Sequence, residues 1–575
     1  MQFAILYTIK KRLIKSHYML SFRILVHKDS ISTGTRGYVF CLKTMNPCYK
    51  NNLTKILGGK KMKKAKKLLG LLTAVSLCIP TVCYADNPIV QTNYTADPAP
   101  MVHGDTLYLY TTHDEDTIEN NFYTMKNWKC YSTKDMQNWT DHGTILGLAD
   151  FSWAKSDAWA AQTVERNGKY YCYIPATRKT GGYAIGVAVS DSPTGPFVDP
   201  LGKPLAEKHG GQDIDPTCFI DDDGQAYLYW GNGNLYGVKL NKDMISYSGS
   251  IQTFTKPNGY IEGPWVYKQN NMYYLVYAGM GSGGENLQYA TSNSPMGPWT
   301  SKGSFMGSKN SFTNHPGVAR FNGNDYMFYH TGDLPGGGSY HRSVCVEQFK
   351  YNSDGTIPTI PMTKNGPNQI GNLNPFVKTE AETFAWGQGV ETEVCSEGGM
   401  DVGMIENGDY LKIKGVDFGT GATSFEARVS SANSGGNIEI RLDSPTGTLV
   451  GTCAVEGTGG WQTWVDKTCK VTGATGIHDL YLKFTGGSSY LLNINNWKFN
   501  GASTPTVKYG DVDGSGSVDA IDFAQIKQNL LGTKDFTADQ IKAADVDGSG
   551  TVDAIDFALV KQYLLRMIEK FPADK

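Results

Sequence analysis

The sequence predicts a mainly β protein: a five-bladed β-propeller, then a β-sandwich, then a small α-helical domain. A turn followed by a tyrosine-rich strand recurs five times within residues 86–372, and short alternating strands fill residues 377–500. An Asp-rich twelve-residue pattern then occurs twice within residues 509–569. The 66 glycines and 33 tyrosines among 575 residues also favour turns and strands over helices.

The five copies of the tyrosine-rich strand are spaced by about 55 residues, which is enough chain for four short strands in each unit. The copies lie at residues 104–110, 168–173, 224–229, 271–277 and 324–329. A second turn motif, such as Ser192-Pro193 or Ser294-Pro295, follows most of them. Repeats of this length and composition predict the blades of a propeller, a closed ring that protects its sheet edges.

The register of the repeat predicts which side chains face the central channel. Counting back 11 or 12 residues from the aligned Tyr108, Tyr171, Tyr227, Tyr274 and Met327 gives Asp97, Trp159, Asp215, Glu262 and His315. A single acidic residue would more often be a solvated surface group. Three acidic residues at five equivalent positions, each beside Pro or Gly, have no ready structural explanation and indicate a catalytic site.

This constellation resembles glycoside hydrolase family 43 over essentially all of residues 86–372. The resemblance implies that Asp97 is the general base, Glu262 the general acid, and Asp215 the group that orients Glu262 and keeps its pKa high. The family inverts the anomeric centre, which requires base and acid to stand about 6.5–9.5 Å apart so that a water molecule fits between them. The resemblance implies no metal for the chemistry itself.

Three further residues complete the predicted substrate site. Trp159 offers a flat apolar wall for a sugar ring, and His315 and Arg342 match family positions beside the substrate or a central ion. His315 has the alternative of a buried structural residue that fills the channel floor. Arg342 has the alternative of a surface charge at a strand end.

The strands of residues 377–500 resemble carbohydrate-binding module family 6. The strings that carry this resemblance include Glu380-Ala381-Glu382, Asn407-Gly408-Asp409-Tyr410, Gly460-Trp461-Gln462-Thr463-Trp464 and Leu492-Asn493-Ile494-Asn495-Asn496-Trp497. The resemblance implies a sugar clamped between Tyr410 and Trp464 with Asn493 bonding its hydroxyls, although Trp464 has the alternative of a core residue. It also implies a structural calcium ion at Glu380 and Glu382.

The duplicated Asp-rich pattern has the oxygen spacing of a calcium loop, because a hard cation takes 6–8 oxygen ligands at about 2.3–2.6 Å. The predicted ligands are Asp511, Asp513, Ser515, Ser517, Asp519 and Asp522 in the first copy, and Asp545, Asp547, Ser549, Thr551, Asp553 and Asp556 in the second. An ordinary EF-hand has Glu at position 12, where both copies have Asp. The pattern resembles the type I dockerin, which attaches enzymes to cohesin domains of a cellulosome scaffold.

The two halves of this expected dockerin, which holds two calcium ions, are nearly identical. Ala520-Ile521 and Ala554-Ile555 occupy equivalent positions that in dockerins contact the cohesin, and an apolar pair is a poor choice for a solvated loop exit. We therefore expect pseudo-twofold symmetry and docking in either of two orientations. A calcium-stabilised helical hairpin without a partner is the alternative.

Residues 62–85 read as a secretory signal, with a basic start, an apolar run and Cys83-Tyr84-Ala85 at the cleavage site. Because this signal is internal, we expect Met62 to be the true start and residues 1–61 to be a mis-assigned upstream extension. Residues 501–508 form the expected linker. The cysteines show no disulfide framework, although Cys453 and Cys469 flank an expected hairpin and are a candidate pair.

A formal net charge of -2 gives no reason to expect a nucleic acid or a membrane as partner.

The expected protein is a secreted, cellulosome-associated hydrolase of plant cell-wall polysaccharide, and α-L-arabinofuranosidase activity on arabinoxylan is the first hypothesis. β-Xylosidase or arabinanase is the rival, because the same three acids serve all of them and specificity is expected in the rim loops 279–284 and 332–339. A non-catalytic polysaccharide binder with a decayed propeller is the hypothesis from another class, and the presence of all three acids argues against it.

Overall fold

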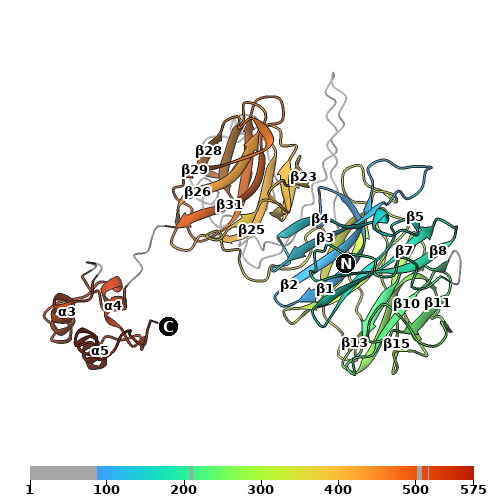
Figure 1. Cartoon of the computed structure of the whole chain (residues 1–575), viewed down its shortest axis with the longest axis horizontal. Coiled ribbons are helices and arrows are strands. Elements are labelled where there is room, and N and C mark those ends of the chain that lie inside the picture. The colour runs from blue at the N-terminus through green and yellow to red at the C-terminus, as the bar shows by residue number, and fades with distance from the viewer. Residues whose placement is uncertain (1–86, 208–211, 502–507, 514, 516, 575) are drawn as a thin grey trace, which may run out of the picture. The chain divides into compact units, whose positions relative to one another are not determined.

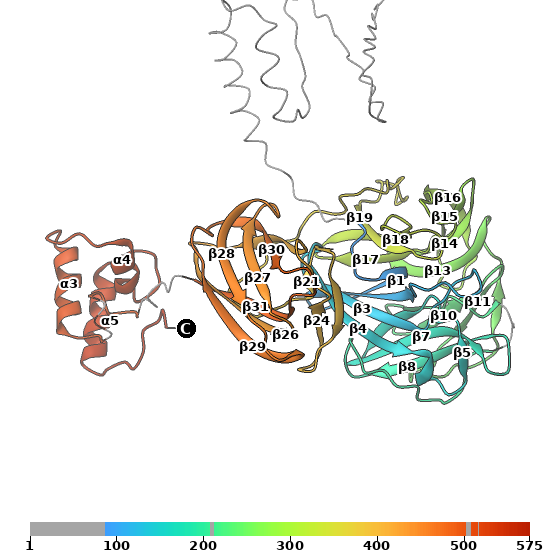
Figure 2. The ribbon, with the colours of Figure 1, turned by 90° about the horizontal axis from the view of Figure 1, so that it is seen from above.

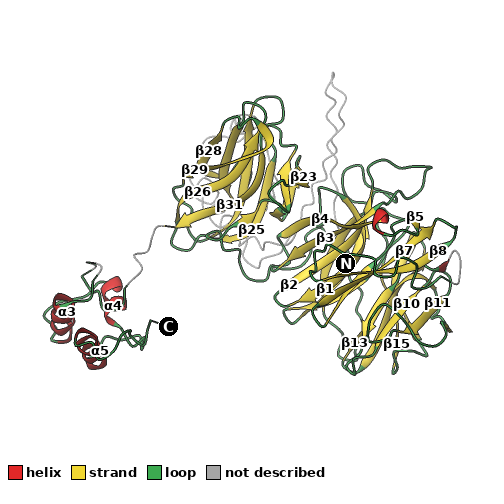
Figure 3. Ribbon diagram, viewed as in Figure 1, coloured by secondary structure: helices red, strands yellow, loops and turns green. Residues whose placement is uncertain are grey.

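The computed structural model describes residues 87–574, apart from residues 208–211, 502–507, 514 and 516. Strands dominate up to residue 501 and helices follow near the C-terminus, which confirms the mainly β prediction (Figures 1 and 3). The expected extension 1–61 and signal 62–85 lie outside the described residues, as does most of the linker 501–508. Within the described ranges, no helix is both long enough and apolar enough to cross a membrane.

Residues 94–349 form five antiparallel sheets (Figure 1). The first contains β1 (Tyr94–His103), β2 (Thr106–Asp114), β3 (Asn127–Thr133) and β4 (Trp139–Gly147), and the short β21 (Thr383–Phe384) pairs with β4. After the 3-10 turn η2 (Leu148–Asp150), the second contains β5 (Ala154–Ser156), β6 (Gln162–Arg166), β7 (Lys169–Arg178) and β8 (Tyr183–Ser190). The third contains β9 (Thr217–Ile220), β10 (Ala226–Trp230), β11 (Leu235–Lys239) and β12 (Gln252–Phe254).

The fourth sheet contains β13 (Tyr260–Gln269), β14 (Met272–Gly281), β15 (Gly284–Ser292) and β16 (Thr300–Met306), and the fifth contains β17 (Gly317–Phe321), β18 (Asn324–Thr331) and β19 (Ser343–Phe349). The first strands contact one another in the order β1, β6, β9, β13, β17, and β17 contacts β1. Five blades around one channel require this order of contacts. We call residues 87–372 the propeller domain.

Buried tyrosines of the repeat join each sheet to the next one. The hydroxyl of Tyr110 donates to the carbonyl of Pro193 at 2.8 Å, and that of Tyr229 donates to the carbonyl of Pro295 at 2.7 Å. Tyr173 bonds the Met244 carbonyl in the same way at 2.7 Å. The tyrosine-rich strand and the Ser-Pro turn of the sequence are therefore two halves of one contact, because a buried hydroxyl needs a hydrogen-bond partner.

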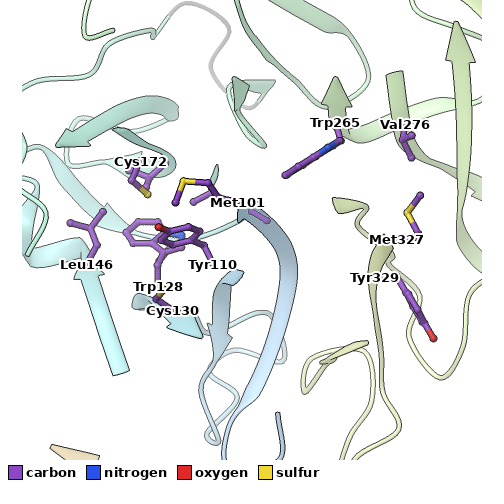
Figure 4. Packing of buried hydrophobic residues seen from close by; sticks show 14 of the residues in the cluster. Met101, Tyr110, Trp128, Cys130, Leu146, Cys172, Trp265, Val276, Met327 and Tyr329 are labelled. Atoms are coloured by element: carbon purple, nitrogen blue, oxygen red, sulfur yellow. The ribbon is translucent and has the colours of Figure 1, made fainter. Parts of the chain in front are cut away.

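Large apolar side chains fill the space between the first two sheets. Trp128 is 1 % exposed and its indole nitrogen donates to the Trp159 carbonyl at 2.7 Å. Met101, Tyr110 and Cys130 gather around it in Figure 4. This packing ties the backbone of residue 159, next to the channel, to the core.

Residues 379–501 form a β-sandwich, as predicted. One sheet has the strand order β23-β24-β31-β26-β29 with β20 paired to β31, and the other has the order β22-β25-β30-β27-β28. The bounds are β20 (Thr379–Glu380), β22 (Trp386–Gln388), β23 (Glu391–Val394), β24 (Met400–Gly403), β25 (Tyr410–Asp417), β26 (Ala422–Ser431), β27 (Gly436–Leu442), β28 (Thr448–Val455), β29 (Gly460–Lys470), β30 (Ile477–Gly486) and β31 (Asn493–Gly501). Phe425, Ile440 and Leu482 are fully buried between the sheets, and Cys453 and Cys469 are free thiols.

Three helices form the C-terminal domain: α3 (Ala520–Leu530), α4 (Ala538–Ala544) and α5 (Ala554–Leu564), labelled in Figure 2. Asp519 and Asp553 cap α3 and α5 at equivalent positions, each accepting from a backbone N–H of the first turn. Phe523 of α3 stacks on Phe557 of α5 with ring centroids 4.1 Å apart. The sequence repeat therefore appears as two equivalent loop–helix units that share one core.

Candidate functional site

One cavity of the propeller domain, of about 190 Å³, is lined by all six residues that the sequence predicts for the catalytic and substrate site. These residues are Asp97, Trp159, Asp215, Glu262, His315 and Arg342. Asp97 lies on β1 and Glu262 on β13, whereas the other four lie in the segments just before β6, β9, β17 and β19. The register argument therefore brought together residues up to 245 positions apart in the chain.

The backbone at the three acids departs from regular strand geometry. Asp97 and Asp215, each followed by Pro, have φ of 52° and 58°, in the left-handed region that non-glycine residues rarely adopt. At the third acid the neighbouring Gly263 has φ of 61°. The pairing of β1 shifts register between Ala96 and Ala99, and that of β13 shifts on both sides of Glu262. These bulges turn the carboxyl groups into the cavity, and such strain clusters at functional sites.

Asp97 and Arg342 form the centre of the site. Arg342 is 3 % exposed and its guanidinium donates to Asp97 Oδ1 at 3.1 Å. Asp114, the last residue of β2, accepts two further bonds from the same guanidinium at 2.8 and 2.9 Å and one from the Arg342 backbone N–H. Arg342 is thus a buried, bidentately held cation and not a strand-end surface charge.

The surroundings of Asp97 favour its ionised form. Burial alone would raise the pKa of this carboxyl, but Arg342, His315, His330 and the Thr112 hydroxyl together hold the pKa below its ordinary value. Thr112 donates to Asp97 Oδ2 at 2.9 Å. A carboxylate that stays ionised can accept a proton from water.

Asp215 and Glu262 have the opposite tendency. Burial, and then the negative charges of Glu262 and Asp97, raise the pKa of Asp215 well above its ordinary value, while the Gly263 N–H bond at 3.0 Å partly opposes this. Burial and Asp97 also raise the pKa of Glu262, against the effects of Asn232 and Arg342. Because two carboxylates in one buried site resist simultaneous ionisation, this pair retains a proton where Asp97 has lost its own.

The sequence reasoning missed several groups that hold these acids. Asn232 donates to Glu262 Oε2, and Asp114 anchors Arg342. Glu285 is buried behind the cavity, where its carboxylate accepts from the Asn314 N–H at 3.3 Å. Burial and the charge of Glu262 raise the pKa of Glu285 to about 8. The sequence could have indicated Asp114, because it is an acidic residue at the end of the tyrosine-rich β2. Asn232 and Glu285 lie outside the repeated motifs, so the repeat could not point to them.

His315 lies beside Asp97, with Nδ1 3.9 Å from Asp97 Oδ1. Burial lowers the pKa of His315, with Asp97 opposing and Arg342 adding to the effect. Trp159 is partly exposed in the cavity wall and packs against Tyr183 with ring centroids 4.9 Å apart. Both residues are placed where a bound sugar would contact them.

The three sugar-binding residues expected in the sandwich lie on two different sheets. Tyr410 is on β25 in one sheet, whereas Trp464 and Asn493 are on β29 and β31 in the other. Trp464 is 9 % exposed and its indole nitrogen donates to Ser396 Oγ at 3.1 Å. The amide of Asn493 is buried and donates to Glu393 at 2.6 Å. Spacing along the chain could not assign these residues to a sheet or a face.

Of the expected calcium ligands in the sandwich, Glu382 fits a cation better than Glu380. Glu382 Oε2 is buried and accepts no hydrogen bond from any described residue. Burial, and then the charges of Glu380, Asp141 and Asp401, raise the pKa of Glu382 to about 9. A rise of this kind is expected when a buried carboxylate has no positive charge beside it. The Glu380 carboxylate instead pairs with Lys378 at 2.7 Å.

Each Asp-rich loop of the C-terminal domain brings three carboxylates within 4.8 Å of one another: Asp511, Asp513 and Asp522 in the first, and Asp545, Asp547 and Asp556 in the second. Asp522 is fully buried and accepts backbone N–H groups from Val512, Asp513 and Asp519. The position-12 Asp therefore organises the loop as well as facing its centre. These oxygen donors suit calcium.

The remaining expected ligands lie in the same loops. Asp519 and Asp553 act as helix caps, and Ser515, Ser517, Ser549 and Thr551 bond within their own turns. The expected cohesin-contacting Ile521 and Ile555 are each 57 % exposed, next to Ala520 and Ala554, which are also exposed. Equal exposure at equivalent positions supports the expected pseudo-symmetry.

Comparison with known proteins agrees with this geometry. The family model Glycosyl hydrolases family 43 matches residues 85–357. The chain is 36 % identical over 479 residues to "Arabinoxylan arabinofuranohydrolase" of Paenibacillus polymyxa, across 72 % of this chain and 74 % of that relative. The chain belongs to glycosyl hydrolase family 43.

This family 43 chain carries two further modules. The model Carbohydrate binding module (family 6) matches residues 380–501, and Dockerin type I domain matches residues 509–565. The "Arabinoxylan arabinofuranohydrolase" of Bacillus subtilis (strain 168) is 35 % identical over 480 residues, across 72 % of this chain and 92 % of that relative. A solved Bacillus subtilis family 43 arabinoxylan arabinofuranohydrolase in complex with cellotetraose has a TM-score of 0.64 at 35 % identity, covering 72 % of this chain and 97 % of that one.

The family 43 chain is thus a glycoside hydrolase of the arabinofuranosidase and xylosidase type. Its binding module and catalytic domain imply a polysaccharide substrate, and its dockerin implies a cohesin partner, calcium and an extracellular, cellulosome-associated setting.

We expect the charge of Arg342 to set the acidic limit of activity, through its effect on the pKa of Asp97. Replacing it in the Arg342→Gln variant removes the cation that lowers the pKa of Asp97, so the acidic limb of the kcat/KM–pH profile should move to higher pH. Arg320→Gln makes the same change at an exposed arginine, 57 % accessible, and should leave the profile in place. An acidic limb that stays unmoved in Arg342→Gln would contradict the assignment of Asp97 as the group that must be ionised.

Proposed function

We propose that this chain is an inverting α-L-arabinofuranosidase that removes arabinose branches from arabinoxylan, secreted and attached to a cellulosome scaffold. The observation that carries the proposal is one small cavity holding both a carboxyl that favours the ionised form, Asp97, and a carboxyl pair that retains a proton, Asp215 and Glu262. General acid–base hydrolysis needs these two protonation states side by side.

In the proposed reaction, Asp97 accepts a proton from a water molecule as the water oxygen forms a bond to the anomeric carbon. Glu262 gives its proton to the glycosidic oxygen as the bond from that oxygen to the anomeric carbon breaks. Asp215 raises the proton affinity of the pair and, through the Gly263 N–H, holds the backbone beside Glu262. Arg342 and Asp114 keep the base ionised and in place.

The choice of arabinofuranosidase over β-xylosidase or arabinanase rests on the relatives. The two arabinoxylan arabinofuranohydrolases align over 479 and 480 residues, which is longer than the propeller domain alone and includes the sandwich. The cavity, at about 190 Å³, lies below the roughly 300–1,000 Å³ of pockets that enclose larger ligands, so it suits a single branch sugar.

Arabinoxylan digestion tests this proposal. The parent enzyme should release arabinose without xylose from wheat arabinoxylan, measured by chromatography of the products. Asp97→Ala and Glu262→Ala should each lower kcat/KM by at least ~10², because a positioned base or acid contributes about that much. Glu262→Ala should lose less on an aryl glycoside whose leaving group needs little protonation.

Asp222→Ala is the matched control, since this acid is 81 % exposed on the third sheet and should keep parental activity. Release of xylose in place of arabinose would overturn the proposed specificity. Near-parental activity of Asp97→Ala or Glu262→Ala would overturn the roles given to these two acids.

We further propose that each dockerin loop binds one calcium ion and that the two halves dock alternatively on a cohesin. The carboxylate clusters at Asp511 and Asp545 supply the donors, and exposed Ile521 and Ile555 supply equivalent contact faces. One more calcium ion at Glu382 of the sandwich is proposed from its orphaned carboxylate oxygen. We propose that the sandwich binds polysaccharide, without assigning individual residues to the sugar contacts.

Paired substitutions test the two docking orientations. Ala520-Ile521 changed to charged residues should leave cohesin affinity largely intact by calorimetry, and so should the same change at Ala554-Ile555. Changing both pairs, or adding a calcium chelator, should abolish binding, because folding of such loops is coupled to the metal. Complete loss from one single-half variant would contradict the two orientations, and full binding in chelator would contradict the calcium loops.

A further inference from the structure

Six aromatic side chains form a continuous arc around the mouth of the catalytic cavity. We call the residues Tyr183, Trp159, Phe122, Tyr123, Tyr340 and Phe312 the aromatic arc. Their ring centroids follow one another at 4.9 Å (Tyr183–Trp159), 6.3 Å (Trp159–Phe122), 5.1 Å (Phe122–Tyr123), 5.0 Å (Tyr123–Tyr340) and 5.6 Å (Tyr340–Phe312). Phe122, Tyr123 and Trp159 also line the cavity itself, so the arc continues its wall outward.

The outer part of the arc presents apolar faces to solvent. Phe122 is 46 % exposed and Phe312 is 42 % exposed. Across residues 87–207 and 212–372, these two are the only aromatic side chains that are exposed. Since a tyrosine-rich propeller otherwise covers its rings, their shared place at one mouth indicates a binding surface and not the scattered apolar exposure of an ordinary protein.

The arc is held rigidly by the catalytic machinery and its neighbours. The Arg342 guanidinium lies over the Tyr123 ring at 4.5 Å, and the Tyr123 hydroxyl is 3.2 Å from Thr313 Oγ1. The Phe312 N–H donates to Ser339 Oγ at 3.1 Å. A Cβ at Gly284, the first residue of β15, would approach the Phe312 backbone to 2.8 Å, so the start of β15 packs directly against it. A surface fixed in this way loses little conformational entropy when it binds.

The size of the cavity decides what this surface can receive. A cavity of about 190 Å³ has room for one sugar ring, so the polymer that bears a branch sugar must remain outside it. The arc residues carry no charge, and flat aromatic faces suit the apolar C–H faces of pyranose rings. A neutral chain of such rings would pass over the exposed faces of Phe122 and Phe312 while its branch enters the cavity.

We propose that Phe122, Tyr340 and Phe312 form a stacking platform for the xylan main chain and give the enzyme its preference for polymer over small glycosides. This inference rests on the proposed arabinofuranosidase function. The platform positions the substrate polymer and takes no part in proton transfer.

The test compares two substrates across a set of full-length variants. The ratio of kcat/KM on wheat arabinoxylan to kcat/KM on an aryl α-L-arabinofuranoside should fall about tenfold in Phe122→Ala and in Phe312→Ala, and further in the double variant. Phe122→Trp keeps a flat face and should retain most of the ratio. Val198→Ala, at an apolar residue 63 % exposed away from the cavity lining, should leave the ratio unchanged.

A second measurement uses unbranched xylooligosaccharide as an inhibitor of aryl glycoside hydrolysis. The parent should be inhibited competitively, and Phe122→Ala and Phe312→Ala should need at least about ten times more inhibitor. Melting temperatures within a few degrees of the parent would show that each variant is folded, as expected for exposed sites.

Equal loss on both substrates, or an unchanged ratio with unchanged inhibition, would overturn the platform while leaving the proposed function in place. A parent enzyme that releases no arabinose from arabinoxylan would overturn the proposed function, and the xylan chain as the occupant would fall with it.

Discussion

The catalytic site depends on the buried contact of Arg342 with Asp97 and Asp114. A guanidinium buried to this degree is stable only with paired carboxylates, and here two carboxylates share one cation. Asp114 accepts the bidentate pair from Nε and Nη2, and Asp97 accepts from Nη1 and stays ionised. Arg342 has a smaller effect on the pKa values of Asp215 and Glu262, and this pair keeps a proton. One buried cation thus separates the carboxylate proposed as base from the pair proposed to hold the acid.

The propeller supplies the rigidity that such a site needs. Tyrosines from one blade bond the carbonyl groups of the next blade's turn, which fixes the blades against one another. Against this frame, the left-handed backbone at Asp97 and Asp215 costs about 1–3 kcal/mol at each residue. At Asp97 the strain persists because β1 pairs with β2 on both sides of the bulge, and Asp215, just before β9, is held by the Gly263 N–H.

Sequence periodicity predicted those residues whose position repeats from blade to blade. Asp97, Trp159, Asp215, Glu262 and His315 share one register, so one alignment found them all. Asp114, Asn232 and Glu285 act through contacts between blades that no local pattern encodes; Asp114 meets Arg342 across 228 residues. In the sandwich, Tyr410 and Trp464 were chosen by spacing, but which sheet and face a strand residue occupies depends on the pairing of distant strands.

The anomeric configuration of the first sugar released tests the division of roles most directly. Proton NMR during early hydrolysis of an α-L-arabinofuranoside reports this configuration before mutarotation obscures it. A base that activates water on the face opposite the leaving group predicts inverted, β-configured arabinose. Arabinose of retained α configuration would mean that a carboxylate attacks the sugar directly, and it would contradict Asp97 as the general base.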